Sequence, residues 1–318
     1  MIKNMFRKFI FIVLIASLLA ETSFAYSIVN FPSTPVENNF IVGPAKIEVE
    51  IPDGESRSEI LTIENRTGRD GIFRISFEDF TAGETAEETV RLLGAENGPF
   101  SLRNNISVTQ NEFKLGHGDR LLLPITISVP AGTPAGNLFG SVIISSSPRA
   151  TRKEDETQAS VGANVIARIV TLIFATIPGD ADMEGVLKSI TTKSGRRIFF
   201  GTPVELRLLF ENSGETYLNP YGIVSVKNIW GTTVERKILD PWFVLPYSER
   251  TRDVLLSGKL FFGKYTATAE INRGYEDIVD KDKATFYVVS PISLLVPLFL
   301  LIFIFLFIFL RQRSRTLI

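Results

Sequence analysis

The chain of 318 residues contains no cysteine. Thiol catalysis, zinc sites built on thiolates and lipid attachment through an N-terminal cysteine are therefore excluded. A protein exported without disulfides depends on its hydrophobic core, and this chain is long enough to form a large one. We expect a bacterial cell surface as its setting.

Histidine is almost as scarce, since His117 is the only one. Gly116 and Gly118 flank it and predict a loop. A single histidine without cysteine argues against a zinc site, and no Gly-x-Ser-x-Gly motif is present to support a serine hydrolase. Acidic pairs such as Glu78 and Asp79 have no spacing that distinguishes a glycosidase from solvated strand ends. We predict that the protein is not an enzyme and uses no cofactor or metal.

A basic excess is missing too, because 34 Lys and Arg residues stand against 35 Asp and Glu residues. Setting aside six basic residues and one acidic residue in the terminal segments leaves 28 basic and 34 acidic residues between them, a net charge of −6. Nucleic-acid binding calls for a basic stripe, so no nucleic-acid partner is expected. The same acidity argues against docking on an anionic membrane surface.

The longest hydrophobic run covers residues 292–310 and carries no charge over 19 residues. About 20 apolar residues in a helix cross a hydrocarbon core of about 30 Å. The basic residues Arg311, Arg313 and Arg315 follow directly, and such residues mark the cytoplasmic side of a span. We predict a transmembrane helix over 291–310 and a basic cytoplasmic tail over 311–318. The alternative is a buried core helix.

The N-terminus agrees with this orientation. It has a basic start, an apolar stretch over residues 9–20, and small residues at Ser23 and Ala25. This pattern predicts a signal peptide over 1–25, cleaved between Ala25 and Tyr26. The alternative is an uncleaved N-terminal anchor. Either way, we expect a single-pass protein of the cell membrane with its ectodomain outside.

Short alternating segments separated by turns rich in Gly, Pro and Asn run through the ectodomain. Such strands at intervals of about 8–12 residues predict β-sandwiches. The fold class is therefore an all-β ectodomain of two tandem Ig-like β-sandwiches, over 45–178 and 179–290, after an extended lead over 26–44. The most apolar part, Val165–Ile177, is too short to cross a bilayer and predicts a buried strand paired with Leu138–Ile144.

A weak internal echo links the two halves. Glu64-Asn65 and Glu211-Asn212 each follow an alternating strand and precede a turn. Asparagine ends strands well because its side chain can bond its own backbone two residues further on. The echo predicts two sandwiches of related construction.

Aromatic residues suggest a binding face in the second half. Trp230, Tyr217 and Tyr221 are our candidate partner-binding residues, since exposed Trp and Tyr are common anchors at interfaces. The alternative is that Trp230 caps a hairpin at Trp230-Gly231 and Trp242 fills the core.

Several motifs carry a family resemblance. They are the strand–turn–strand segment Glu48–Asn65, the segment Leu121–Ile144 with Val129-Pro130, Gly132, Gly136 and Gly140, then Phe210-Glu211-Asn212 with Tyr217–Pro220, and Gly263-Lys264-Tyr265. Over about residues 40–315 the chain resembles the WxL-interacting surface proteins of Gram-positive bacteria. The resemblance implies a signal peptide, two Ig-like domains, a membrane helix and a basic tail. It also implies a scaffold whose first domain binds peptidoglycan and whose second binds a protein.

These observations favour a non-enzymatic, membrane-anchored surface protein that binds a cell-wall polymer, a surface protein or both, of scaffold or adhesion type. One alternative is an assembly or secretion factor that acts on subunits by strand addition, which requires an open edge strand in the first domain. Another is a surface hydrolase, which requires a cleft with converging acids.

The arginine cluster predicts that the C-terminus is cytoplasmic. In the Ser314→Cys variant, the new thiol should resist an impermeant reagent in intact cells and react after permeabilisation. The Ser27→Cys variant is the control and should react in intact cells. Ready labelling of Ser314→Cys in intact cells would contradict the topology.

Overall fold

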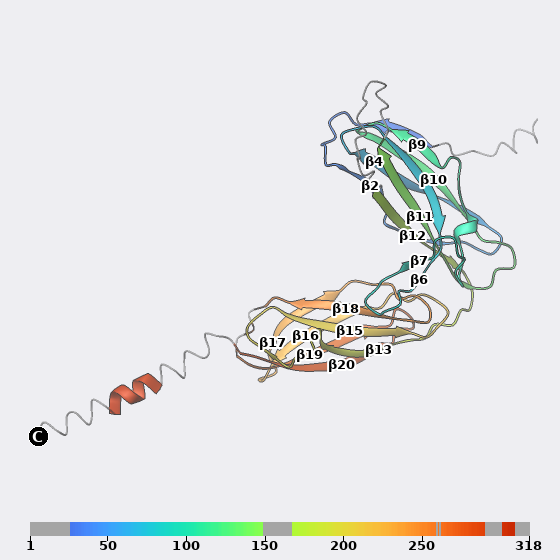
Figure 1. Cartoon of the computed structure of the whole chain (residues 1–318). Helices are drawn as coiled ribbons and strands as arrows, with labels where there is room; N and C mark the ends of the chain where they lie inside the picture. Colours follow the sequence, from blue (N-terminus) through green and yellow to red (C-terminus); the bar gives the residue numbers. More distant parts are fainter. Residues whose placement is uncertain (1–25, 149–166, 259, 261, 290–300, 309–318) are drawn as a thin grey trace, which may run out of the picture. The chain divides into compact units, whose positions relative to one another are not determined.

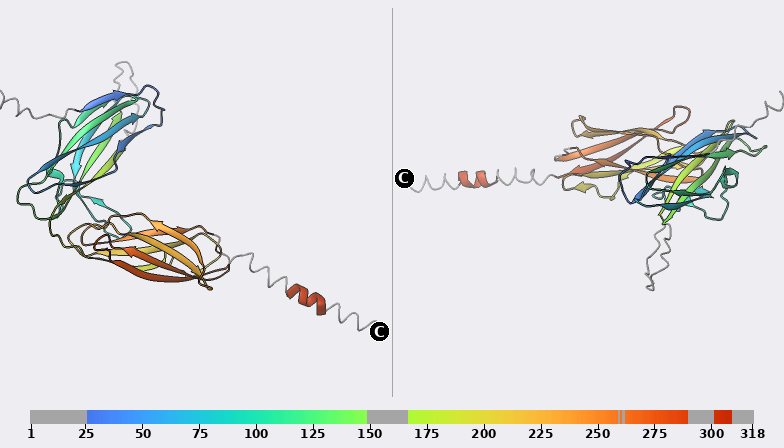
Figure 2. Two further views of the ribbon diagram at one scale, coloured as in Figure 1. Left: turned by 180° about the vertical axis from the view of Figure 1, so that it is seen from behind. Right: turned by 90° about the horizontal axis from the view of Figure 1, so that it is seen from above.

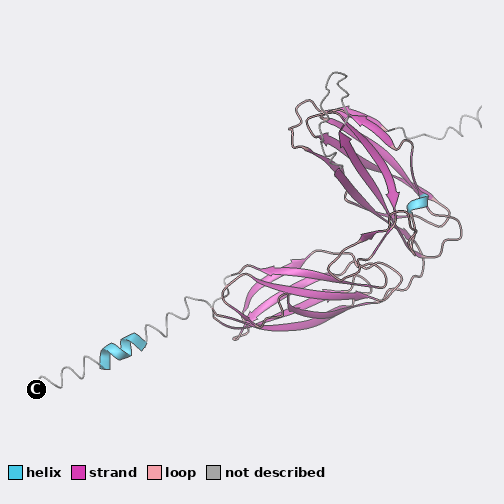
Figure 3. Ribbon diagram, viewed as in Figure 1, coloured by secondary structure: helices cyan, strands magenta, loops and turns pink. Residues whose placement is uncertain are grey.

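The computed structural model describes residues 26–148, 167–258, 260, 262–289 and 301–308. In these residues the structure is almost entirely β (Figure 3), so the predicted all-β class is confirmed. The helical segments described are the 3-10 turn η1 (Arg103–Asn105) and residues 301–308.

The predicted terminal segments fall mostly outside this range. The signal peptide with Ala25 and the arginines Arg311, Arg313 and Arg315 lie outside the described residues. Eight residues of the predicted transmembrane helix are described, and all eight are helical, apolar and exposed. None of the described helical segments has both the length and the hydropathy to cross a membrane.

Contacts divide the chain into two compact units. The first contains the chain up to Glu78, Leu102–Thr133 and Gly140–Ala175, and the second contains the remainder. In this division Asp79–Ser101 and Pro134–Phe139 group with the second unit. Within that unit, Ala86 O accepts a hydrogen bond from the backbone N–H of Thr251 at 2.8 Å.

The first unit is a sandwich of two sheets, which Figures 1 and 2 show from three sides. One sheet has the order β1 (Ser27–Asn30), β10 (Asp119–Ser128), β4 (Ser56–Arg66) and β2 (Asn39–Gly43), with β8 (Ile106–Val108) also paired to β10. The other has the order β3 (Lys46–Glu50), β12 (Ala167–Ile177), β11 (Gly136–Pro148), β5 (Gly71–Glu78) and β9 (Glu112–Leu115). The predicted pairing of the apolar strand with its predecessor is confirmed, since β12 lies beside β11.

Residues 26–44, which the sequence predicts as an extended lead, contain the strands β1 and β2. β1 pairs with β10 and β2 pairs with β4, both antiparallel. Both strands are short edge strands. All of β1 is exposed and β2 buries only Phe40, so neither strand needs an alternating apolar pattern.

The second unit is also a two-sheet sandwich. One sheet has the order β13 (Gly185–Thr192), β15 (Val204–Asn212) and β18 (Ser248–Leu256). The other has the order β14 (Ile198–Phe199), β20 (Val279–Val288), β19 (Gly263–Asn272), β16 (Tyr221–Asn228) and β17 (Thr233–Leu239). A separate two-strand ribbon joins β6 (Phe80–Thr81) to β7 (Arg91–Leu92).

Alternation along the strands builds both cores. Every second residue of β10 from Leu121 to Ile127 is fully buried, and so is every second residue of β15 from Val204 to Phe210. The pairing of β10 with β4 sets Leu121 opposite Ile63 and Leu123 opposite Leu61. A shift by one residue would turn these side chains to solvent, so burial fixes the register.

The internal echo corresponds to one hydrogen-bond pattern used twice. The fully buried Asn65 amide donates to the carbonyls of Arg69 and Leu115, both at 2.9 Å, while its oxygen accepts the Thr67 N–H at 3.0 Å. Asn212, equally buried, makes the same bonds in the second unit. It donates to Thr216 and Val244 and accepts the Gly214 N–H at 3.1 Å. Each asparagine thus satisfies a tight turn and a neighbouring strand at once.

The Asn65→Ala and Asn212→Ala variants should each lower the free energy of unfolding by about 3 kcal/mol. Each change removes three hydrogen bonds made by a buried amide side chain, and each such bond contributes about 1 kcal/mol net. Denaturant titration of the full chain measures the loss.

Asn272 is the matched control, because it accepts the Gly274 N–H at 2.8 Å in the same kind of turn but near the surface. The Asn272→Ala variant should cost less than about 1 kcal/mol. Equal losses for all three variants would contradict a special role for the buried pair.

Candidate functional site

The structure does not bring the three candidate aromatic residues into one surface. Tyr221 begins β16 and is 42% exposed, whereas Trp230 lies beyond its other end and is 79% exposed. Tyr217 is half-buried, with its ring edge-on to that of Phe139 at 6.2 Å in the same unit. Trp230 does cap the β16–β17 hairpin, and Trp242 lies in the core. Each candidate remains a separate prediction as a partner-binding residue.

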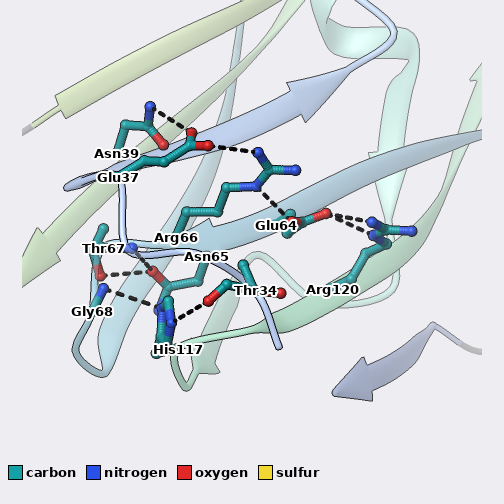
Figure 4. A network of polar contacts seen from close by, with 10 residues as sticks. All are labelled: Thr34, Glu37, Asn39, Glu64, Asn65, Arg66, Thr67, Gly68, His117 and Arg120. Atoms are coloured by element: carbon teal, nitrogen blue, oxygen red, sulfur yellow. Dashed lines mark hydrogen bonds and ion pairs between the residues drawn. The ribbon is translucent and has the colours of Figure 1, made fainter. Parts of the chain in front are cut away.

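His117 has a structural environment. Its Nδ1 accepts the backbone N–H of Gly68 at 3.2 Å, and its Nε2 lies 3.0 Å from the Thr34 carbonyl, to which it can donate (Figure 4). The ring therefore joins the β4–β5 turn to the segment between β1 and β2. In the described part of the chain, no group of three His, Cys, Asp or Glu residues could hold a metal ion.

Beside it, Glu64 is buried between two arginines (Figure 4). One carboxylate oxygen accepts from Arg66 Nε at 2.6 Å, and the other accepts from Arg120 Nε at 2.9 Å and Nη2 at 2.6 Å. The hydrogen bond from Arg66, followed by those from Arg120, holds the pKa of Glu64 below its usual value despite the opposing effect of burial. All of its strong acceptors are used within the fold, so this carboxylate is a structural group.

The most suggestive feature for binding is an incompletely paired edge. β3 lies beside β12, and its start is fixed by two contacts: Leu172 N–H donates to Ala45 O at 3.0 Å, and Lys46 lies over the Phe174 ring at 5.6 Å. Just after β3, Asp53 accepts the N–H groups of Gly132 and Thr133, and Gly179, just after β12, lies beside the nearby Ala135. The two strands therefore end at the same end of the sandwich, and β3 runs along the second part of β12, from Leu172 onward. The first part, Ala167–Val170, has no described strand on that side. We call these four residues the β12 half-edge.

The backbone of this half-edge points outward at alternate residues. Leu172 faces β3, so the N–H and C=O groups of Val170 and Arg168 face the same side. Ala167 and Arg168 are exposed, and Ile169 and Val170 are half-buried. Arg168 is held by Glu78 at 3.1 Å. The half-edge thus combines outward hydrogen-bonding groups with partly exposed apolar side chains.

A small pocket adjoins the start of the half-edge. It lies between β2, the β4–β5 turn, the end of β11 and Ala167, and its walls include Phe40 and Ser146. A strand laid along the half-edge would pass beside this opening between the two sheets.

A second half-edge occurs on β4 but has a different character. β2 pairs with Thr62–Arg66, so Ser56–Leu61 has no described partner on that side. This stretch carries Arg57 and Glu59, and charged residues on an edge oppose strand addition. The β12 half-edge is therefore the better candidate site.

Sequence reasoning identified β12 but missed its half-edge. The missing information is that β2 and β3 belong to different sheets, and no local pattern in residues 39–50 states this. Pro44 between two alternating segments is the one sequence signal of the break.

No family model and no curated protein matches the chain. Among solved structures, the class 5 fimbriae chaperone CfaA matches at 15% identity and a TM-score of 0.37, covering 79% of this chain and 99% of that one. The Escherichia coli chaperone DraB matches at 14% identity and a TM-score of 0.36, with coverages of 78% and 96%. A chaperone–tip adhesion subunit complex of Csu pili from Acinetobacter baumannii matches at 13% identity and a TM-score of 0.36, covering 79% of this chain and 99% of that one. Likenesses at these scores carry no argument about function.

The Glu64 ion cluster predicts acid sensitivity of the first unit. A carboxylate with a lowered pKa stabilises the fold above its unfolded-state pKa, and that contribution is lost as the pH falls through the folded-state value. Glu64→Gln should lower the free energy of unfolding by about 2 kcal/mol at neutral pH, the scale of a hydrogen bond to a charged group, and should lose less further stability in acid than the parent.

Glu112→Gln is the control, because the Glu112–Arg74 pair at 2.8 Å lies on the surface, where such pairs contribute little. The free energies of unfolding of the parent, Glu64→Gln and Glu112→Gln are compared at neutral and acidic pH. An unchanged acid slope in Glu64→Gln would contradict the assignment.

Proposed function

We propose that the chain is a membrane-anchored binding protein of the cell envelope that captures an extended segment of a partner protein along the β12 half-edge. The single observation that carries this proposal is the outward-facing backbone of Arg168 and Val170, with no described strand beside it. Extended peptides add to such edges through main-chain hydrogen bonds, and adjacent pockets select their side chains.

We favour strand addition over a scaffold that binds cell-wall polymer. An open edge in the first sandwich is the feature by which the two differ. A polymer of sugars gains nothing from a row of peptide N–H and C=O groups, whereas a peptide pairs with them directly. The resemblance to the WxL-interacting surface proteins also implies a protein partner, but for the second domain, and it implies peptidoglycan for the first.

The membrane anchor and the outward orientation belong to the proposal. They rest on the uncharged run over 292–310, the following arginines and the signal-peptide pattern. The fimbrial chaperones have the same general fold, but their likeness is too low to support the proposal, which depends on the half-edge itself.

Val170→Pro tests the half-edge directly. Proline removes an N–H that points away from β11, so the β11–β12 pairing stays intact. Val170→Thr keeps the N–H and the β-branched shape and is the matched control. A photoactivatable crosslinking residue replacing the exposed Ala167 reports the partner in intact cells. Loss of one net hydrogen bond of about 1.4 kcal/mol should reduce the protein adduct about tenfold in Val170→Pro.

The Val170→Thr adduct should equal that of the parent, and all three proteins should melt alike. Equal adducts in Val170→Pro and Val170→Thr would contradict strand addition at this edge. A parent that forms no protein adduct but is retained on purified cell-wall polymer would favour the polymer-binding scaffold instead.

A further inference from the structure

One end of the second sandwich collects the strand termini from which the chain continues toward residues 301–308. The register places Gly263 opposite Val288, and Ile198–Phe199 of β14 beside Tyr287–Val288. Asn228, the last residue of β16, lies opposite Tyr265 near the same end. We call this end of the second unit the exit end.

The exit end carries the most exposed aromatic side chains of the two sandwiches. Trp230, Phe200 and Phe262 are 79%, 78% and 65% exposed, respectively. Ile198 and Ile229 are also exposed beside them. Exposed apolar side chains gathered at one end of a domain indicate a contact surface, because a monomer in water gains nothing from them.

The backbone holds these side chains in place. The side-chain oxygen of Asn228 accepts the N–H groups of Trp230 at 3.1 Å and Thr232 at 3.0 Å, and Gly231 at φ +79° completes the turn. Phe199 O accepts the N–H of Val289 at 2.8 Å, which ties the segment preceding Phe200 to the departing chain. Trp230 is therefore presented from a fixed turn, and Phe200 follows a strand that is tied to the departing chain.

Chain length limits what can lie next to this end. Three peptide units separate Val289 from Ile292, the first residue of the uncharged run, and they span at most about 11 Å. If the run crosses the bilayer, the exit end lies within that distance of the hydrocarbon boundary. A folded domain of about 100 residues has a radius of gyration of about 13 Å and would not fit between them.

We propose that the exit end docks on the bilayer, with Trp230, Phe200 and Phe262 inserted into the lipid headgroup layer. This inference rests on the membrane anchor proposed above. Trp and Tyr concentrate at membrane–water boundaries because a large ring is apolar while its edge can hydrogen-bond. Ring insertion does not require a basic surface, so the net acidity that argues against electrostatic docking does not oppose it. The contact would hold the second unit upright on its anchor.

Trp230 provides its own probe, because the only other tryptophan, Trp242, is buried in the core. The full chain is reconstituted into phosphatidylcholine vesicles with and without bromine-labelled acyl chains, which quench nearby indoles. The difference between the parent and Trp230→Phe isolates the Trp230 signal. Bromine-labelled lipid should remove most of this signal, and aqueous iodide should have little effect on it.

A matched reporter at the opposite end comes from Tyr247→Trp in the Trp230→Phe background. Tyr247 is 64% exposed and precedes β18, whose nine residues span about 30 Å toward the exit end. This reporter should be quenched by iodide and not by the labelled lipid. Quenching of both reporters by lipid would overturn end-on docking, because the unit would then lie on its side.

Other outcomes separate the docking from the anchor. If Trp230 is open to iodide and unaffected by labelled lipid while the protein resists alkaline carbonate extraction, the anchor stands, the docking fails and Trp230 is left available to a protein partner. If carbonate releases the protein, the anchor proposal fails and the docking fails with it.

Discussion

The passage of the chain from one sheet to the other between β2 and β3 constrains the rest of the first sandwich. Gly43 ends a strand paired with β4, and after two intervening residues Lys46 begins a strand beside β12. One segment thus covers parts of two edges and leaves the remainder of each uncovered. The β12 half-edge and its charged counterpart on β4 are both consequences of this single crossing.

The same unit shows why such an edge can persist without causing aggregation. A free edge invites pairing with any extended chain, and proteins limit this with charge and short length. On β4 the uncovered stretch carries Arg57 and Glu59. On β12 the described stretch Ala167–Val170 carries Arg168, which Glu78 holds in place. Charge on both uncovered stretches therefore limits unselective pairing.

Both sandwiches also depend on the buried asparagines at the ends of β4 and β15. A tight turn against a neighbouring strand leaves carbonyls that water cannot reach, and Asn65 and Asn212 satisfy them with the same geometry. Beside each asparagine, a glutamate is paired across the sheet. Glu64 bonds Arg120, and Glu211 bonds Lys188 at 2.9 Å. The short echo in the sequence thus corresponds to a repeated physical solution.

The sequence predicts those parts of the fold that local periodicity determines. Alternation locates strands such as β10 and β15, and Trp230-Gly231 locates a hairpin whose Gly231 has the positive φ that the turn needs. Local periodicity does not identify the edge strands of the first unit. β1 is exposed along its whole length and β2 buries only Phe40, so residues 26–44 lack the alternation that marks a strand and are predicted only as an extended lead. The candidate site could not be predicted from local patterns either, because an uncovered edge depends on which strands are absent from its side.

Energetics indicate what a partner of the half-edge must bring. Arg168 and Val170 offer at most two N–H and two C=O groups, and four hydrogen bonds at about 1 kcal/mol net contribute about 4 kcal/mol. Association costs about 4–15 kcal/mol in lost freedom of motion, so these bonds alone cannot hold a ligand. With a cost of about 8 kcal/mol, a micromolar complex at about −8 kcal/mol needs about 12 kcal/mol more. At about 25 cal/mol per Å², this corresponds to burial of about 480 Å² of apolar surface.

The opening between the sheets beside Ala167, with Phe40 in its wall, is where a partner's apolar side chain could begin to supply that area. Recognition at this edge would therefore require a partner segment whose alternate residues are large and apolar, paired to the backbone in one register.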